Sequence, residues 1–173
     1  YSMLKILDQI LPITQDQIIE SINHLELISK NISSQNLTDS NSAINTALWI
    51  SGIPLIYYPF GLQSAAFRFK SSLHENTKMH AMIEDVIEAS HNNIVSWEKH
   101  SIVQPILIRG ADDYIKTKER WEITKQYLSS NDIDYKEINS VSGNILSKII
   151  CLFYLFDYVS IYKAIIDKTD PTP

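Results

Sequence analysis

Short apolar runs between helix-like segments constrain the fold of this chain more than any other feature. The run IPLIYYP, residues 53–59, lies between Gly52 and Gly61 and is rich in β-branched and aromatic side chains. This composition is typical of a strand that is buried on both faces, as the strands of a parallel sheet are. Comparable runs predict three further strands, at residues 79–83, 104–110 and 133–139.

Segments with helical periodicity separate these strands. After the first strand, apolar residues recur at the spacing of a helix that packs on a sheet: Leu62, Ala65, Ala66, Phe69 and Leu73. Residues 113–129 predict the helix between the last two strands. Strands that alternate with helices form βαβ units, so we expect an α/β fold. It should be a three-layer α/β/α sandwich with a mostly parallel sheet of four or five strands.

The two ends of the chain are predicted to be helical as well. Residues 14–30 predict an amphipathic surface helix, which a loop rich in Ser, Asn and Asp connects to a short helix at 43–50. We therefore treat 1–42 as an N-terminal helix and polar loop that lead into a domain at 43–173. Apolar residues surround the last helix, 145–166, almost completely. This pattern predicts burial by more than one neighbour, including a second domain or subunit.

Composition excludes several classes of protein. The 173 residues are 45% apolar and carry a net charge of −5 without a basic cluster, so a nucleic-acid partner is not expected. Lys148, Asp157 and Lys163 interrupt the most apolar segment, and no run approaches the ~18 apolar residues of a membrane span. No signal peptide is visible, so the cytoplasm is the expected location. The single cysteine, Cys151, excludes a disulfide within the chain and is interpreted as a buried hydrophobic residue.

A ligand of such a sheet would bind at the loops that follow the carboxyl ends of the strands. Neither a Rossmann fingerprint nor a P-loop motif is present, and the chain has only four glycines. The segment SGN, residues 142–144, could offer backbone N–H groups to an anion, but Ser142 as an ordinary N-cap is the simpler interpretation. The histidines lack the spacing of a zinc site, so no metal is expected.

One concentration of chemically versatile residues remains: Glu75, Lys78, His91, Asn92, Asn93, Trp97 and Glu98. In a structural interpretation, Glu75 and Lys78 form a solvated helix end and His91 caps the next helix. In a functional interpretation, Glu75 and His91 supply a carboxylate and an imidazole, which can move protons at carbon and oxygen near neutral pH. Composition alone favours the structural interpretation, and periodicity does not decide between the two.

Three separate segments carry a family resemblance. Residues 52–81, GIPLIYYPFGLQSAAFRFKSSLHENTKMHA, resemble a strand, a helix and an N-E-N-x-K segment. Residues 89–98, ASHNNIVSWE, resemble N-H-N-E-[IL]-x-G-W-E, and residues 154–173, YLFDYVSIYKAIIDKTDPTP, resemble a segment that ends in D-P-T-P. In this order and spacing, the segments resemble the C-terminal half of the bifunctional phosphoglucose/phosphomannose isomerases. These enzymes are a branch of the sugar isomerase (SIS) domain superfamily, whose fold is flavodoxin-like.

The resemblance implies an aldose–ketose isomerase of glycolysis and gluconeogenesis. Glucose 6-phosphate or mannose 6-phosphate is ring-opened, and a proton moves between C2 and C1 through a cis-enediol to give fructose 6-phosphate. Glu75 occupies the position of the family's catalytic base, and His91 occupies that of the histidine assigned to ring opening. The resemblance implies no cofactor. Whether mannose 6-phosphate is accepted as well as glucose 6-phosphate stays open at this point.

The resemblance also implies partners. The family's N-terminal SIS domain, with its phosphate-binding loop, has no counterpart in this sequence, and a lysine used for ring opening lies beyond the D-P-T-P segment. Active sites in the family are shared between domains and subunits, with the histidine contributed across a homodimer. We therefore expect the C-terminal SIS domain of a longer protein, and we expect this piece alone to be a poor enzyme.

Two other interpretations stay open. One is a non-catalytic SIS module that binds a sugar phosphate for regulation, and the other is a flavodoxin-like binding domain outside this superfamily. Glu75 and His91 favour the isomerase, because a sensor needs neither of them. His74 and Asn93 depart from the family pattern, in which Asn and Glu are usual, and the roles of His74 and Lys78 stay undetermined.

Overall fold

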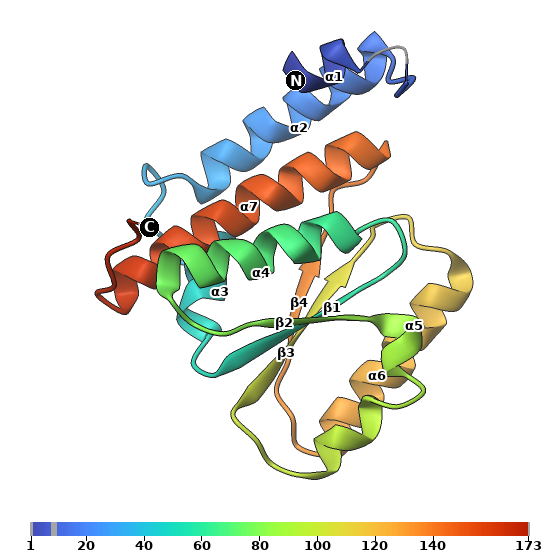
Figure 1. Cartoon of the computed structure of the whole chain (residues 1–173), viewed down its shortest axis with the longest axis vertical. Coiled ribbons are helices and arrows are strands. Elements are labelled where there is room, and N and C mark those ends of the chain that lie inside the picture. Colours follow the sequence, from blue (N-terminus) through green and yellow to red (C-terminus); the bar gives the residue numbers. More distant parts are fainter. Residues whose placement is uncertain (1, 8–9, 173) are drawn as a thin grey trace.

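A computed structural model describes residues 2–7 and 10–172 (Figure 1). Within these residues, four strands form one parallel sheet in the order β2-β1-β3-β4. The strands are β1 (Ile53–Tyr58), β2 (Met82–Asp85), β3 (Val103–Arg109) and β4 (Lys136–Asn139). The predicted α/β class and the parallel sheet are confirmed.

Helices cover both faces of the sheet (Figure 1). Their bounds are α1 (Ser2–Ile6), α2 (Gln15–Ile32), α3 (Ser42–Trp49), α4 (Gln63–Thr77), α5 (Val86–Ala89), α6 (Ile115–Ser130) and α7 (Ile145–Ile166), with a 3₁₀ helix η1 at Ile94–Glu98. Helices α3, α4 and α7 lie on one face, and α5, η1 and α6 lie on the other. The α/β/α sandwich is therefore present, and α2 adds a further layer outside α7.

Two strand predictions were wrong at their starting residues. β2 begins at Met82 instead of residue 79, because α4 ends with Lys78 in a left-handed conformation (φ 58°) and the next three residues lead to the sheet. β4 begins at Lys136 instead of residue 133. The backbone N–H of Ile133 donates to the carbonyl of Leu128, so this apolar residue belongs to the end of α6.

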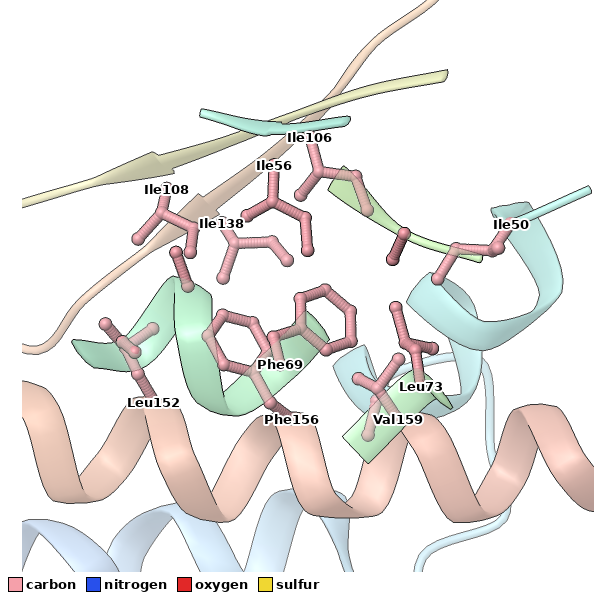
Figure 2. Packing of buried hydrophobic residues seen from close by; sticks show 14 of the residues in the cluster. Ile50, Ile56, Phe69, Leu73, Ile106, Ile108, Ile138, Leu152, Phe156 and Val159 are labelled. Atoms are coloured by element: carbon pink, nitrogen blue, oxygen red, sulfur yellow. The ribbon is translucent and has the colours of Figure 1, made fainter. Parts of the chain in front are cut away.

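The larger core lies between the sheet and α4, α3 and α7. Phe69 of α4 and Phe156 of α7 stack with their ring centroids 4.2 Å apart. Four strand residues cover this pair from the side of the sheet (Figure 2): Ile56, Ile106, Ile108 and Ile138. On the other face, Leu107 and Trp121 are buried in a second cluster with α5, η1 and α6. Both faces of the sheet are therefore covered by apolar side chains, as a parallel sheet requires.

Helix α7 is apolar all round because other helices pack on opposite sides of it. Helices α3 and α4 contact it on the side of the sheet, and α2 contacts it on the outside (Figure 1). The Tyr162 hydroxyl donates to the carbonyl of Ile32 over 2.9 Å, which joins α7 to the end of α2. Among the described helices, only α7 has a length and composition that would suit a membrane span, a property that core helices share. Cys151 is buried in α7, and this burial raises the pKa of its thiol to about 11.

The aromatic stack should account for much of the stability of this face. We expect Phe156→Ala to lower the free energy of unfolding by about 3–5 kcal/mol, because it leaves a cavity opposite the Phe69 ring. Phe60→Ala is the matched control, since the Phe60 side chain is 94% exposed and its loss should be nearly neutral. Denaturant unfolding monitored by circular dichroism measures both changes. Equal effects of the two variants would contradict this assignment of the core.

Candidate functional site

A pocket of about 200 Å³ lies beyond the carboxyl ends of β1 and β3. In a sheet of order 2-1-3-4 the connections diverge between these two strands, which is where open α/β sheets bind ligands. Phe60 lines the pocket after β1, Asp112 and Asp113 line it after β3, and Lys148 lines it from α7. The sheet therefore has a pocket at the expected edge, but two of these residues are acidic.

The two aspartates accept hydrogen bonds from backbone N–H groups at this edge of the sheet. Asp113 Oδ2 accepts from the N–H of Gly110 over 3.0 Å and also from the indole of Trp121 over 3.2 Å. Asp112 Oδ2 accepts from the N–H of Gly143 over 3.3 Å and pairs with Lys148 Nζ at 3.0 Å. The hydrogen bond from Lys148 is the main reason that the pKa of Asp112 lies below its ordinary value.

A third carboxylate lies at the start of α7. The predicted cap residue was wrong: Asn144, and not Ser142, is the N-cap, and its side chain accepts from the N–H of Ser147 over 3.0 Å. Glu20 of α2 accepts from the N–H of Asn144 over 2.8 Å and from the Ser147 hydroxyl over 3.2 Å. The bond from the Asn144 N–H is the main reason that the pKa of Glu20 is lowered.

Gly143 allows this close approach. Its φ is +100°, a conformation that L side chains rarely adopt, and a Cβ atom at this position would collide with the Glu20 carboxylate. The SGN segment thus directs its backbone N–H groups at carboxylates of the same chain. Because Asp112, Asp113 and Glu20 occupy the donors that a phosphate would need, this edge is unsuited to an anion.

Glu75 lies at the opposite edge of the sheet. Helix α4 starts after the carboxyl end of β1 and runs back to the amino end of β2, and Glu75 is in its last turn. Its side chain is exposed, and within residues 2–7 and 10–172 no hydrogen bond or ion pair engages its carboxylate. Arg68, two turns earlier, is electrostatically coupled to Glu75, but Asp157 of α7 holds its guanidinium through bonds of 2.8 and 2.9 Å.

Hydrogen bonds fix the turn around Glu75. The Asn76 amide donates to the Ser160 hydroxyl of α7 over 2.8 Å, which anchors the turn to the neighbouring helix. The Thr77 hydroxyl donates to the Leu73 carbonyl over 2.6 Å. These contacts restrict the backbone that carries Glu75, while its carboxylate stays available to a ligand.

His74 and Lys78 fasten the same turn to the chain that follows it. His74 Nε2 lies 3.2 Å from the backbone nitrogen of Ala81, whose N–H donates to it. Lys78 Nζ donates to the Glu75 carbonyl over 2.6 Å and to the Thr172 carbonyl over 2.9 Å. The sequence did not reveal these contacts, because only the fold brings residue 172 to this helix end.

His91 lies on the other face of the sheet. It follows α5. His91 and the preceding Ser90 line one side of a pocket of about 380 Å³, and Lys116, Arg120 and two further residues of α6 line the rest. The capping role that the structural interpretation gave to His91 is not observed. The side chain of Asp85 caps α5, the 3₁₀ helix η1 follows Asn93 without a side-chain cap, and the backbone N–H of His91 donates to the Glu88 carbonyl. The imidazole is exposed and available for contact.

The segment after His91 is anchored by a buried tyrosine that sequence reasoning missed. The Tyr57 hydroxyl of β1 donates to Asn93 Oδ1 over 2.5 Å and accepts from the Trp97 indole over 2.9 Å. Burial raises the pKa of Tyr57, so it stays a neutral donor. Asn93 and Trp97 therefore hold the loop in place, whereas Glu98 is exposed and accepts a bond of 3.4 Å from Tyr127.

The structure does not bring Glu75 and His91 together within one chain. Glu75 lies at the amino edge on the face covered by α4, and His91 follows the carboxyl end of β2 on the face covered by α6 (Figure 1). The sheet itself separates the two residues. One ligand could contact both side chains only if they came from different copies of the chain.

The parallel sheet and its two helical layers define an α/β/α sandwich. The comparison with protein families places this sandwich in the SIS class of the phosphosugar isomerases. Residues 39–173 match the family of the bacterial phospho-glucose isomerase C-terminal SIS domain. The chain therefore belongs to this family. The match begins within the loop before α3 and extends through the end of the chain.

Curated relatives carry the name bifunctional phosphoglucose/phosphomannose isomerase. The protein of Caldicellulosiruptor bescii is 30% identical over 165 residues, which cover 91% of this chain and 48% of that protein. The protein of Aquifex aeolicus is 26% identical over 124 residues, which cover 70% of this chain and 39% of that protein. The chain thus spans about half the length, or less, of the curated relatives that it matches.

Solved structures support the fold. A glucose-6-phosphate isomerase like protein from Thermus thermophilus superposes with a TM-score of 0.73 at 15% identity, over 91% of this chain and 55% of that chain. The C-terminal domain of glucosamine-fructose-6-phosphate aminotransferase from Francisella tularensis gives a TM-score of 0.60 at 15% identity, over 93% and 49% of the two chains. At these identities, the likeness establishes the fold alone.

The carboxylate of Glu20, at the start of α7, should make the stability of the domain depend on pH in the acidic range. Because the folded-state pKa of Glu20 is lowered, its stabilising effect is present above about pH 4.5 and is lost as the pH falls through the folded value. We expect Glu20→Gln to melt at a lower temperature than wild type at pH 7, and the difference to shrink below about pH 4.5. Differential scanning calorimetry from pH 7 to pH 3 measures this, with the exposed Glu26→Gln as control. A difference in melting temperature that does not change with pH would contradict a stabilising role of the ionised Glu20 carboxylate.

Proposed function

We propose that this chain is the C-terminal half of an enzyme that isomerises hexose 6-phosphates. The substrates are glucose 6-phosphate, mannose 6-phosphate or both, and the product is fructose 6-phosphate. The proposal is supported by the family match and by the name of the relatives. The observation that carries it is the free carboxylate of Glu75, which lies in a turn whose other polar side chains are all hydrogen-bonded.

Glu75 is suited to act as the base. Within the described part of the chain both of its carboxylate oxygens are unengaged, so one of them can take the proton from C2 of the open-chain aldose and return it to C1 after the cis-enediol has formed. The hydrogen bonds of Asn76 and Thr77 restrict the backbone of the turn that carries this carboxylate. Since a proton leaves one carbon and reaches the next, the reaction consumes no oxidant or reductant.

The phosphate group must then be held by another part of the protein. The loops at the carboxyl edge direct their N–H groups at Asp112, Asp113 and Glu20, which would repel a dianion. Since the curated relatives are about twice as long, we assign phosphate binding to a preceding SIS domain of the same polypeptide. A regulatory sugar-phosphate module is less well supported, because Asp112, Asp113 and Glu20 oppose an anion at the edge where such a sheet binds its ligand.

A homodimer would complete the site. Glu75 and His91 lie on opposite faces of the sheet, so we propose that His91 of one copy assists ring opening at the Glu75 of the other. A two-fold axis would then create two identical sites from the same pair of surfaces. The exposed His91 imidazole, in its pocket of about 380 Å³, is free to make such a contact.

The assignment of the base is tested with the full-length polypeptide. We expect Glu75→Gln to lower kcat for glucose 6-phosphate by ~100-fold or more, because the amide cannot accept the carbon-bound proton. Glu26→Gln, at an exposed glutamate of α2, is the control and should keep wild-type activity. A coupled assay of fructose 6-phosphate formation measures both. Activity of Glu75→Gln above about one per cent of wild type would reject Glu75 as the base.

The shared site is tested by mixing two inactive variants. Glu75→Gln and His91→Ala dimers each have defects in both sites, but a mixed dimer has one intact site. After subunit exchange at equal concentrations, half of the dimers are mixed, so activity should recover to roughly a quarter of wild type if the sites are shared by a two-fold axis. No recovery, with exchange verified by tagged subunits, would show that His91 does not act across the dimer.

A further inference from the structure

We propose that Lys78 is a positioning residue that clasps residues 167–172, the segment after α7 that we call the tail, to the turn that carries Glu75. The inference rests on the proposed function for its kinetic consequences, but the clasp itself is a contact between two segments. One ammonium group joins the carbonyl of Glu75 at 2.6 Å to the carbonyl of Thr172 at 2.9 Å. The second of these bonds joins residues that are 94 positions apart in the sequence.

The backbone at position 78 does not explain a lysine. Lys78 has a φ of 58°, at the end of α4, where glycine is the residue that best fits a left-handed conformation. Its side chain folds back along the helix end, where cations are stabilised by the last carbonyl groups. Lys78, whose backbone is left-handed, therefore places its own ammonium group next to the peptide group of Glu75.

The tail has its own local structure that presents a carbonyl to Lys78. Asp170 Oδ1 accepts from the backbone N–H of Thr172 over 2.9 Å and from its hydroxyl over 2.6 Å. The two bonds from Thr172, together with the positive charge of Lys78, hold the pKa of Asp170 below its ordinary value. The turn at Asp170 and Thr172 thus closes on itself, and Lys78 attaches it to α4.

The clasp has a consequence for catalysis. Because the carbonyl of Glu75 is bonded to Lys78, a loss of the ammonium frees the last turn of α4 to shift relative to the tail. A small displacement of a base from its reacting atom lowers the rate of the chemical step and leaves substrate binding largely unchanged. Lys78 should therefore affect kcat much more than KM.

The decisive variant is Lys78→Gly in the full-length polypeptide. Glycine removes the ammonium but suits the left-handed backbone, so the variant should fold and melt at or above the wild-type temperature. We expect kcat for glucose 6-phosphate to fall by about 10- to 100-fold, with KM changed by less than about threefold. Lys78→Arg, which keeps a cation, should recover most of the lost rate. Lys70→Met is the matched control, because Lys70 lies on the same helix but contacts the Phe67 ring.

A second measurement reports on the clasp without using activity. Hydrogen exchange followed by mass spectrometry should show faster exchange in a peptide that covers residues 167–172 in Lys78→Gly, and wild-type exchange in Lys70→Met. Asp170→Asn should loosen the same peptide. If both residues act through one clasp, the kinetic losses of Lys78→Gly and Asp170→Asn should combine to less than their sum in free energy.

The outcomes separate this inference from the proposed function. A wild-type protein without isomerase activity rejects the proposed function, and exchange of the tail then decides whether Lys78 is a clasp. An active wild type with Lys78→Gly kinetics within about twofold, or unchanged tail exchange in that variant, overturns the clasp as a positioning device. A large rise in KM with unchanged kcat would also overturn it, because that pattern indicates direct substrate binding by Lys78.

Discussion

The packing of α4 on α7 is the interaction on which the rest of the structure depends. The stacked rings of Phe69 and Phe156 fix the two helices against the sheet. Polar contacts add to this packing, through Arg68 with Asp157 next to the stacked rings and through Asn76 with Ser160 near the end of α4. One helix pair thus supplies both the hydrophobic core and the anchor of the turn that carries the proposed base. A shift of α7 would move that turn with it.

Continuous apolar runs and helical periodicity made much of this fold predictable. The strand at 53–59 and the helix at 145–166 were identified because burial requires apolar side chains at neighbouring positions, and such a pattern is visible in the local sequence. The starts of β2 and β4 were not predictable in this way. Ile133 looks like a strand residue in the sequence, but its backbone closes the end of α6.

The candidate site was less accessible to sequence reasoning, because its contacts join distant parts of the chain. Glu75 and His91 were identified through a family resemblance, and composition alone favoured a structural role for them. The bond from Asn76 to Ser160 spans 84 positions, and no local pattern indicates it. The N-cap of α7 was misplaced for a related reason. Ser142 and Asn144 are both good caps, and the choice depends on Glu20, a residue of another helix.

The two edges of the sheet carry opposite kinds of carboxylate. At the carboxyl edge, Asp112, Asp113 and Glu20 each accept a backbone N–H group, so their charge serves to hold loops and α2 in place. At the amino edge, Glu75 accepts none within the described residues, although every polar neighbour in its turn is bonded. The carboxyl edge, where open α/β sheets bind ligands, is thereby unsuited to anions, while the carboxylate of Glu75, the proposed base, stays open at the other end. Under the proposed function, the phosphate group and the reacting carbons of the substrate would therefore be held by different structural units, which a two-domain chain can provide.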